Sequence, residues 1–268
     1  MLRKKKSARF IDDREKKLHF FHIPKTAGRS VIAGIGRVAY PSLGHKEIYR
    51  KIVKQQIDIN QEYISCMTHD FGEFFLTYGH VTFLSVMEPR WVINKADDKL
   101  FLQIHGSGLN PDCFTFTVFR DPVERMFSRY KEYIQEMSTG VTPSLGIALK
   151  TDKEMSDEIT FIEFMKELPT SLLYEQLYYF AVKEPCWLEE QNIKKAVQNV
   201  LSLNKVLFTE TIDQDIKYIS EHIGDNITLG EKFARNTRQI SDEERAIATT
   251  LLETEYLFLE LVKQGLNS

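Results

Sequence analysis

Cysteine is scarce in this chain of 268 residues, and the three that occur, Cys66, Cys113 and Cys186, lie far apart. An odd number without the close pairs of a metal site predicts buried thiols rather than a disulfide framework or a zinc site. Apolar runs long enough to cross a bilayer are also missing, as are internal repeats and low-complexity segments. We therefore expect a soluble globular protein without a membrane span.

Charge of one sign is not in excess either. The net charge of −3 at pH 7 gives no reason to expect a nucleic-acid partner. Residues 1–17 are an exception, with eight Lys or Arg against three Asp or Glu, and they predict a basic, flexible arm. This arm has neither the apolar core nor the cleavage site of a signal peptide. We expect a cytoplasmic protein, or a lumenal one if an N-terminal anchor precedes these residues.

Strand and helix patterns alternate after the arm, and we predict one domain over residues 18–268. Besides a first strand near residue 18, strands are expected at 63–67, 81–87, 112–119 and 205–209. Helices are expected at 28–37, 44–57, 71–78, 122–137, 212–223 and from 241 onward, with two or three more up to residue 203. The alternation predicts an α/β fold with a mostly parallel central sheet, flanked by helices on both faces, and a ligand beyond the carboxyl ends of its strands.

The segment 18–30, LHFFHIPKTAGRS, carries an apolar strand pattern into a short turn and a helix. The first amides of a helix lack intrahelical partners, so such a turn can bind an anion. Lys25 adds a mobile positive charge, and Gly28 allows the backbone to approach a ligand. Nucleotide-kinase chemistry is disfavoured because Lys25 precedes Gly28, and Ser30 follows it, instead of the order Gly-Lys-Ser/Thr. The alternative is a plain connection with a solvated lysine.

A second strand-turn-helix unit follows at 112–130. The Asp-Pro pair at 121–122 is a good N-cap and first helical residue. Arg120, at the end of the predicted strand, offers a planar guanidinium that can hold a phosphate at two points. Ser128 lies about two helical turns further on and on nearly the same face. The alternatives are an ion pair of Arg120 with the carboxylate at 121 or 124, and a hydroxyl on the helix surface at 128.

Two more arginines, Arg125 and Arg129, follow on the same predicted helix. We expect them at the surface, as partners of Glu124 and Glu132, or at the outer edge of a positive site. Neither is assigned to the ligand.

These two units resemble, in the same order, the 5′-phosphosulfate loop and the 3′-phosphate site of sulfotransferases that use 3′-phosphoadenosine 5′-phosphosulfate (PAPS). The resemblance lies in HIPKTAGRS at 22–30 and FTVFRDPVERMFSRY at 116–130. It implies a three-layer, P-loop-like fold, PAPS as donor, adenosine 3′,5′-bisphosphate as product, and no required metal. The donor-site residues that it implies are Lys25, Thr26, Ala27, Gly28, Arg29, Ser30, Arg120 and Ser128. Arg29 stands where many relatives carry Thr or Ser, so its charge would face the sulfuryl group or an anionic acceptor.

His80 stands in the segment YGHV at 78–81, directly before a predicted strand. This setting resembles that of uronyl 2-O-sulfotransferases of the heparan and dermatan type, in which the equivalent histidine is the catalytic base. An imidazole with an ordinary pKa of about 6.5 can take the proton of a hydroxyl near neutral pH. Other candidates for the base are His22, His69 and Glu88, although His22 is expected to orient the loop. The resemblance implies a carbohydrate acceptor; a small-molecule or lipid alcohol and a peptide tyrosine are the alternatives.

The basic segment FARNTR at 233–238 lies ahead of the last predicted helix. It resembles the loop that closes over the nucleotide in related enzymes, which makes Arg235 and Thr237 candidate contacts of the 3′-phosphate; the alternative is a solvated connection. Together the motifs predict in-line transfer from PAPS to a hydroxyl, with His80 as base and Lys25 stabilising the leaving phosphate. Two other functions stay open: an ATP-dependent phosphotransferase, and a non-catalytic module that binds nucleotide or glycan.

Overall fold

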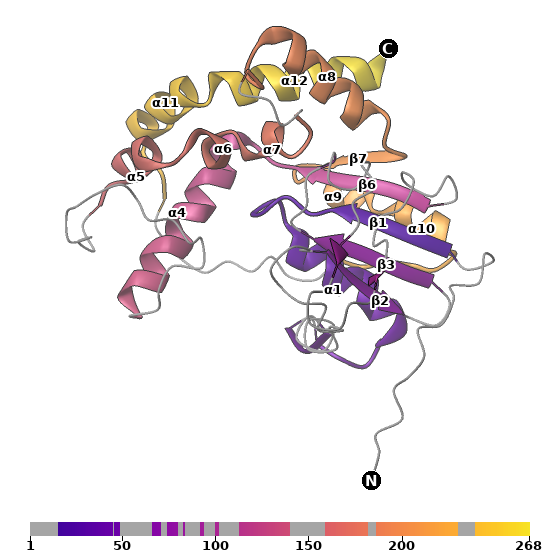
Figure 1. Ribbon diagram of the computed structural model, residues 1–268. Coiled ribbons are helices and arrows are strands. Elements are labelled where there is room, and N and C mark those ends of the chain that lie inside the picture. Colours follow the sequence, from indigo (N-terminus) through magenta and orange to yellow (C-terminus); the bar gives the residue numbers. More distant parts are fainter. Residues whose placement is uncertain are drawn as a thin grey trace.

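Figure 1 shows the computed structural model of the chain. The structure describes residues 16–44, 46–48, 66–70, 74–79, 83, 92–93, 100–101, 113–139, 159–181, 186–229 and 239–268. The first strand begins at Lys16, two residues before the start of the predicted domain. Three predicted site residues, His80, Arg235 and Thr237, lie outside the described residues, as do residues 1–15 of the predicted arm.

The central sheet has five strands in the order β2-β3-β1-β6-β7. Strands β3, β1, β6 and β7 are parallel neighbours, and β2 runs antiparallel to β3 at the edge. A separate antiparallel pair consists of β4 and β5. The strands are β1 (Lys16–Phe21), β2 (Cys66–Asp70), β3 (Phe74–Gly79), β4 (Val92–Ile93), β5 (Leu100–Phe101), β6 (Cys113–Phe119) and β7 (Lys205–Phe208). The predicted α/β class with a mostly parallel sheet is confirmed.

The helices are α1 (Gly28–Ala39), α4 (Pro122–Ser138), α5 (Phe161–Glu167), α6 (Thr170–Leu173), α7 (Glu175–Tyr178), α8 (Glu190–Leu201), α9 (Ile212–Asp215), α10 (Lys217–Ile223), α11 (Asp242–Leu251) and α12 (Glu253–Asn267). Among the described helices, none has the length and apolar character needed to cross a membrane.

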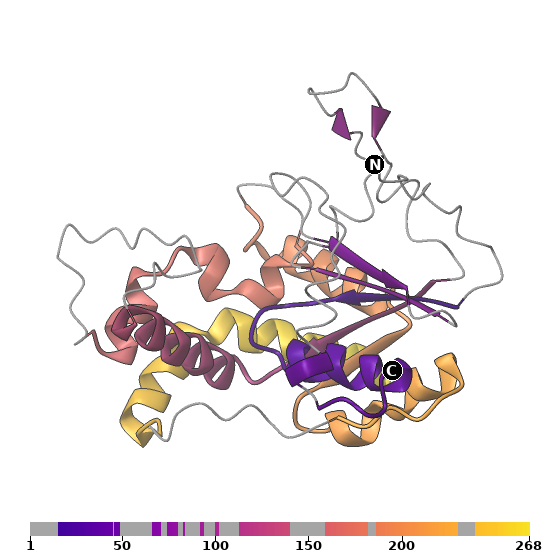
Figure 2. The same cartoon turned by 90° about the horizontal axis from the view of Figure 1, so that it is seen from below.

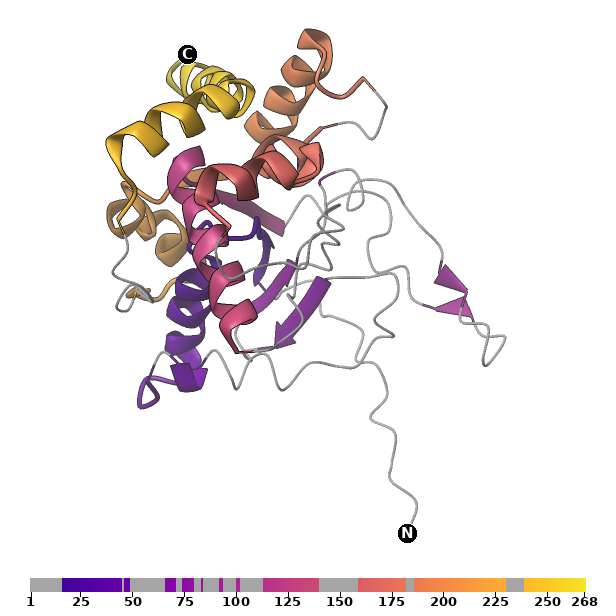
Figure 3. The ribbon, with the colours of Figure 1, turned by 90° about the vertical axis from the view of Figure 1, so that its left-hand side faces the viewer.

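Helices pack on both faces of the sheet (Figure 2). Leu18 and Phe20 of β1 pack against α1, α9 and α10 on one face, whereas Phe21 packs against α7, α8 and α12 on the other. This alternation follows from the two-residue period of a strand. A third apolar cluster joins α4, α5 and α11, and Figure 3 shows α4 and α11 next to each other.

Three predictions for the first half of the sheet were wrong in type or position. Residues 74–79 form β3 rather than part of a helix at 71–78; their aromatic and β-branched residues suit a strand that pairs with β1. The strand predicted at 63–67 is shifted, since β2 begins at Cys66. Of the strand predicted at 81–87, only Phe83 is described, and it is helical and buried.

The helices predicted at 28–37 and 122–137 are confirmed as α1 and α4. Two long predicted helices are each divided: α9 and α10 meet at Ile216, and α11 and α12 meet at Leu252, which is fully buried. The stretch before residue 203 holds four described helices, α5 to α8, instead of two or three. Most of the helix predicted at 44–57 lies outside the described residues.

Candidate functional site

The turn between β1 and α1 lies at the carboxyl end of the central strand. Lys25 and Ala27 both have left-handed backbone conformations, with φ of 70° and 64°. Such conformations cost non-glycine residues about 1–3 kcal/mol each and concentrate at functional sites. Between them, buried Thr26 donates a hydrogen bond from Oγ1 to the carbonyl oxygen of Ile23 at 2.8 Å. Turns that contain left-handed residues can form concavities of backbone N–H groups that bind anions.

The first amides of α1 follow this turn directly in the chain. The carbonyl oxygen of Ala27 accepts hydrogen bonds from the N–H groups of Ser30 and Val31, at 2.9 and 3.1 Å, which begins the helix. Within the described part of the chain, the N–H groups of Thr26, Ala27 and Gly28 donate to no other residue. Because the N-terminus of a helix also carries the positive end of its dipole, these amides are suited to bind an anionic oxygen.

Gly28 is required by a contact inside the protein. A Cβ atom at this position would lie 1.8 Å from Nε2 of His22. The buried imidazole of His22 is also stacked on Phe20, with 5.2 Å between the ring centroids. His22 thus lies between Phe20 of β1 and Gly28 in the first turn of α1, a position from which it can orient the loop. The close approach that we attributed to a ligand at Gly28 is therefore made by His22.

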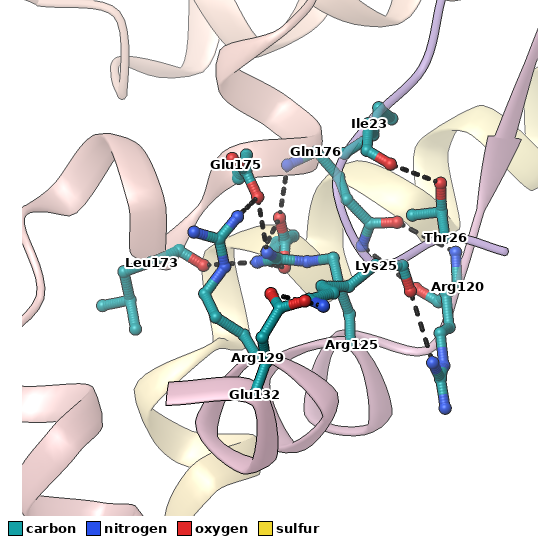
Figure 4. Close-up of polar contacts among 11 residues, drawn as sticks. Ile23, Lys25, Thr26, Arg120, Arg125, Arg129, Glu132, Leu173, Glu175 and Gln176 are labelled. Carbon is teal, nitrogen blue, oxygen red and sulfur yellow. Dashed lines mark hydrogen bonds and ion pairs between the residues drawn. The ribbon is translucent and has the colours of Figure 1, made fainter. Parts of the chain in front are cut away.

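The ammonium group of Lys25 is largely buried and ion-paired, unlike the solvated lysine of a plain connection. Its Nζ atom lies 2.5 Å from Oε2 of Glu132 on α4, and the side chain is 19% exposed (Figure 4). The other carboxylate oxygen of Glu132 lies 3.8 Å from Nη2 of Arg29. Burial lowers the pKa of Lys25, and the neighbouring carboxylate of Glu132 opposes this effect. The loop therefore holds a largely buried cation next to the first turn of α1.

Arg120 joins the two motifs. Its Nη1 atom donates a hydrogen bond to the carbonyl oxygen of Lys25 at 3.3 Å. This contact is possible because β1 and β6 are parallel neighbours, with Phe21 opposite Thr117, so both strands end at the same edge of the sheet. The predicted alternative, an ion pair with Glu124, is also present, with 3.6 Å between Nη2 and Oε2. Arg120 is 29% exposed and has further donors to offer a ligand.

The start of α4 determines where Ser128 lies. As predicted, Asp121 caps this helix, since Oδ1 accepts a hydrogen bond from the N–H of Glu124 at 2.9 Å. The other oxygen, Oδ2, accepts from the hydroxyl of Tyr256 at 2.7 Å. Ser128 is half-buried and lies one helical turn before Glu132, so both are on the face of α4 that meets Lys25. The structure thus brings Lys25, Arg120 and the Ser128 face of α4 together.

The prediction that Arg125 and Arg129 lie at the surface was wrong. Both are fully buried, and both bind the carboxylate of Glu175. Arg125 also contacts Oε2 of Glu255 at 3.1 Å and the carbonyl oxygen of Leu173 at 2.8 Å. Burial raises the pKa of Glu255, although Arg125 opposes this effect. This buried charge cluster ties α4 to α7 and α12, and its partners come from parts of the chain that local spacing does not connect.

Gln176 links this cluster to Arg120. Its backbone N–H donates to Oε1 of Glu255 at 2.8 Å. Its side chain accepts from the N–H of Arg120 at 2.9 Å and donates to the carbonyl oxygen of Arg120 at 3.0 Å. Two hydrogen bonds therefore hold the backbone at the end of β6, which orients Arg120 toward the loop (Figure 4).

Sequence analysis missed Glu132 as a partner of Lys25, as well as Glu175, Gln176 and Glu255. A signal for Glu132 exists, because it follows Ser128 by four residues on the helix face assigned to the ligand. No local signal marks the other three. Neither the protein-family models nor the curated proteins compared with this chain give a match.

Proposed function

We propose that the protein is a sulfotransferase that moves a sulfuryl group from PAPS to an acceptor hydroxyl, and that its fold is P-loop-like. The observation that carries this proposal is the hydrogen bond from Arg120 to Lys25, which joins the two segments that resemble the donor site. PAPS carries phosphate groups on both the 5′ and the 3′ oxygen of one ribose. A protein that binds it therefore needs two neighbouring anion sites, and we propose that they lie at the adjacent ends of β1 and β6.

The residues of the first site suit a phosphosulfate group. The amides of residues 26–28 and the ammonium of Lys25 are donors for its oxygens, with Ser30 on the first turn of α1. At the second site, the partly exposed guanidinium of Arg120 and the hydroxyl of Ser128 would hold the 3′-phosphate. Arg235 and Thr237 stay predicted contacts of the same phosphate.

PAPS supplies an activated sulfuryl group when it is bound. In the proposed reaction, the acceptor oxygen forms a bond to sulfur while the bond between sulfur and the bridging phosphate oxygen breaks. His80 takes the hydroxyl proton as general base. Lys25 stabilises the negative charge that develops on the leaving oxygen, and the amides of residues 26–28 hold the phosphate. We propose a carbohydrate acceptor on the basis of the sequence around His80.

Calorimetric titration tests the donor site. Adenosine 3′,5′-bisphosphate should bind the wild type with or without magnesium, and Lys25→Ala and Arg120→Ala should each weaken binding about tenfold or more. Lys194→Ala, at an exposed position of α8, is the matched control and should bind as the wild type does. A preference for magnesium ATP would favour the phosphotransferase instead.

Turnover tests the reaction itself. Candidate carbohydrate hydroxyls should accept sulfate from PAPS, and His80→Ala should abolish transfer while it retains the bisphosphate. Binding without transfer to carbohydrate, small-molecule, lipid or tyrosine acceptors would indicate the non-catalytic module.

A further inference from the structure

Glu132 brings a negative charge into the anion-binding turn. It projects from α4 toward α1, and its two oxygens face two different cations of the loop, Lys25 at 2.5 Å and Arg29 at 3.8 Å. The Glu132 side chain is only 17% exposed, so water screens these contacts little. This arrangement, with one oxygen for each cation, is the one that two oxygens of a bound phosphate or sulfate group would adopt.

The backbone of Lys25 is held in place by its neighbours, so Glu132 and a bound anion would compete for its ammonium group. Its carbonyl oxygen is bound by Arg120, and its φ of 70° is held between the bond of Thr26 to Ile23 and the start of α1. The main chain is therefore fixed, and only the side chain can change partner. An anion at the amides of residues 26–28 would approach the same ammonium that Glu132 now contacts. Two negative groups that close together repel each other strongly where water is excluded.

We infer that Glu132 is a displaceable internal counter-ion, which occupies the cations of the loop in the free protein and sets the affinity for an incoming phosphate or sulfate group. This inference rests on the proposed function in so far as that group is the 5′ end of the donor or product. Glu132 is accordingly a residue that weakens and selects anion binding, rather than one that holds the ligand. Its rotation away from Lys25 is a condition for binding.

The test compares the calorimetric affinity of wild type, Glu132→Gln and Glu132→Ala for adenosine 3′,5′-bisphosphate and for inorganic pyrophosphate. Removing the carboxylate should tighten binding about tenfold, because the ligand no longer has to displace a negative charge. A merely structural role for Glu132 would weaken binding instead. Glu221→Gln removes the same charge from an exposed position of α10 and should leave the affinity unchanged.

A double-mutant cycle locates the effect. In a Lys25→Ala background, Glu132→Gln should tighten binding by a smaller factor than in the wild type, because the shorter of the two cation contacts of Glu132 is already gone. Equal or weaker binding by both Glu132 variants in the wild-type background would overturn the inference. So would an undiminished gain in the Lys25→Ala background, since the carboxylate would then act through another group.

The two ligands separate this inference from the proposed function. Glu132→Gln could tighten the binding of pyrophosphate while the bisphosphate binds no better than pyrophosphate. The inference about Glu132 would then be supported, and the proposed PAPS site would be overturned. If the bisphosphate binds well and the Glu132 variants do not raise its affinity, the proposed donor site is supported and the inference about Glu132 is overturned. If neither anion binds any of the variants, the loop is no anion site and both are overturned.

Discussion

The guanidinium of Arg120 donates a hydrogen bond to the carbonyl oxygen of Lys25, across 95 residues of sequence. The contact holds the backbone of the loop at a residue with positive φ, while the Lys25 ammonium points toward Glu132 (Figure 4). A single interaction thus holds the loop conformation and brings two cations to one edge of the sheet.

Arg120→Lys should weaken the binding of adenosine 3′,5′-bisphosphate although it retains the charge. A lysine ammonium cannot reach the Lys25 carbonyl and a phosphate in the two-point manner of a planar guanidinium. We expect a loss of about tenfold, approaching that of Arg120→Ala. Calorimetry at constant ionic strength measures it. Full affinity in Arg120→Lys would show that only charge matters at this position.

Glu255→Gln should destabilise the protein, because it leaves the buried guanidinium of Arg125 with less negative charge around it. Breaking a buried ion pair costs about 3–5 kcal/mol, and the retained amide should keep the loss near the lower end of this range. Urea unfolding measures it. Glu260→Gln, at an exposed position of the same helix, is the control and should leave the free energy of unfolding nearly unchanged.

The same variant also tests how Arg120 is positioned. Glu255 accepts the backbone N–H of Gln176, which in turn clamps the end of β6. Glu255→Gln should therefore weaken bisphosphate binding under conditions in which the variant is still folded. Wild-type affinity in the folded variant would show that the clamp on β6 does not depend on the buried charges.

The parts of the site that could be predicted are those that short segments encode. The strand at 113–119 is rich in apolar and aromatic residues, and the turn before α1 lies within the segment 22–30, so local residues predict both. The segment 74–79 was predicted as part of a helix although its aromatic residues favour a strand, and its pairing with β1 shows the strand.

The buried arginines show why the rest could not be predicted. Arg125 has carboxylates nearby in sequence, which is the usual pattern of a surface helix. Its partners in the fold, Glu175 and Glu255, are 50 and 130 residues away. Glu132 is similar, because its contact with Lys25 depends on how α4 packs against the loop.

Gly28→Ala should destabilise the loop, because the new methyl group would overlap the imidazole of His22 at 1.8 Å. Overpacking of this kind costs about 1–3 kcal/mol and should shift the loop that carries Lys25. Urea unfolding and bisphosphate titration measure the two effects. Gly44→Ala is a matched control, since its nearest neighbour is the flexible end of Glu47 at 3.3 Å.

A second substitution identifies the cause of that loss. Gly28→Ala combined with His22→Ala should recover part of the stability that Gly28→Ala alone removes, because the clashing ring is gone. If the double variant is as unstable as the sum of the two single variants, the clash with His22 is not the cause.

Anion binding should decline with rising pH before a free lysine would lose its proton. Burial lowers the pKa of Lys25 from its ordinary value of 10.5; Glu132 raises it, and Arg29 and Arg129 lower it further. Only the protonated ammonium attracts the anion, so the affinity is full below the pKa of Lys25 in the free protein and falls as the pH rises through it. In Glu132→Gln the pKa should be lower still, because a negative neighbour is lost, and the decline should begin at a lower pH. Lys25→Arg, whose guanidinium stays charged, should remove this decline. Pyrophosphate affinity measured calorimetrically from neutral pH upward tests the order of the three proteins, and a decline at the same pH in all three would assign the titration to another group.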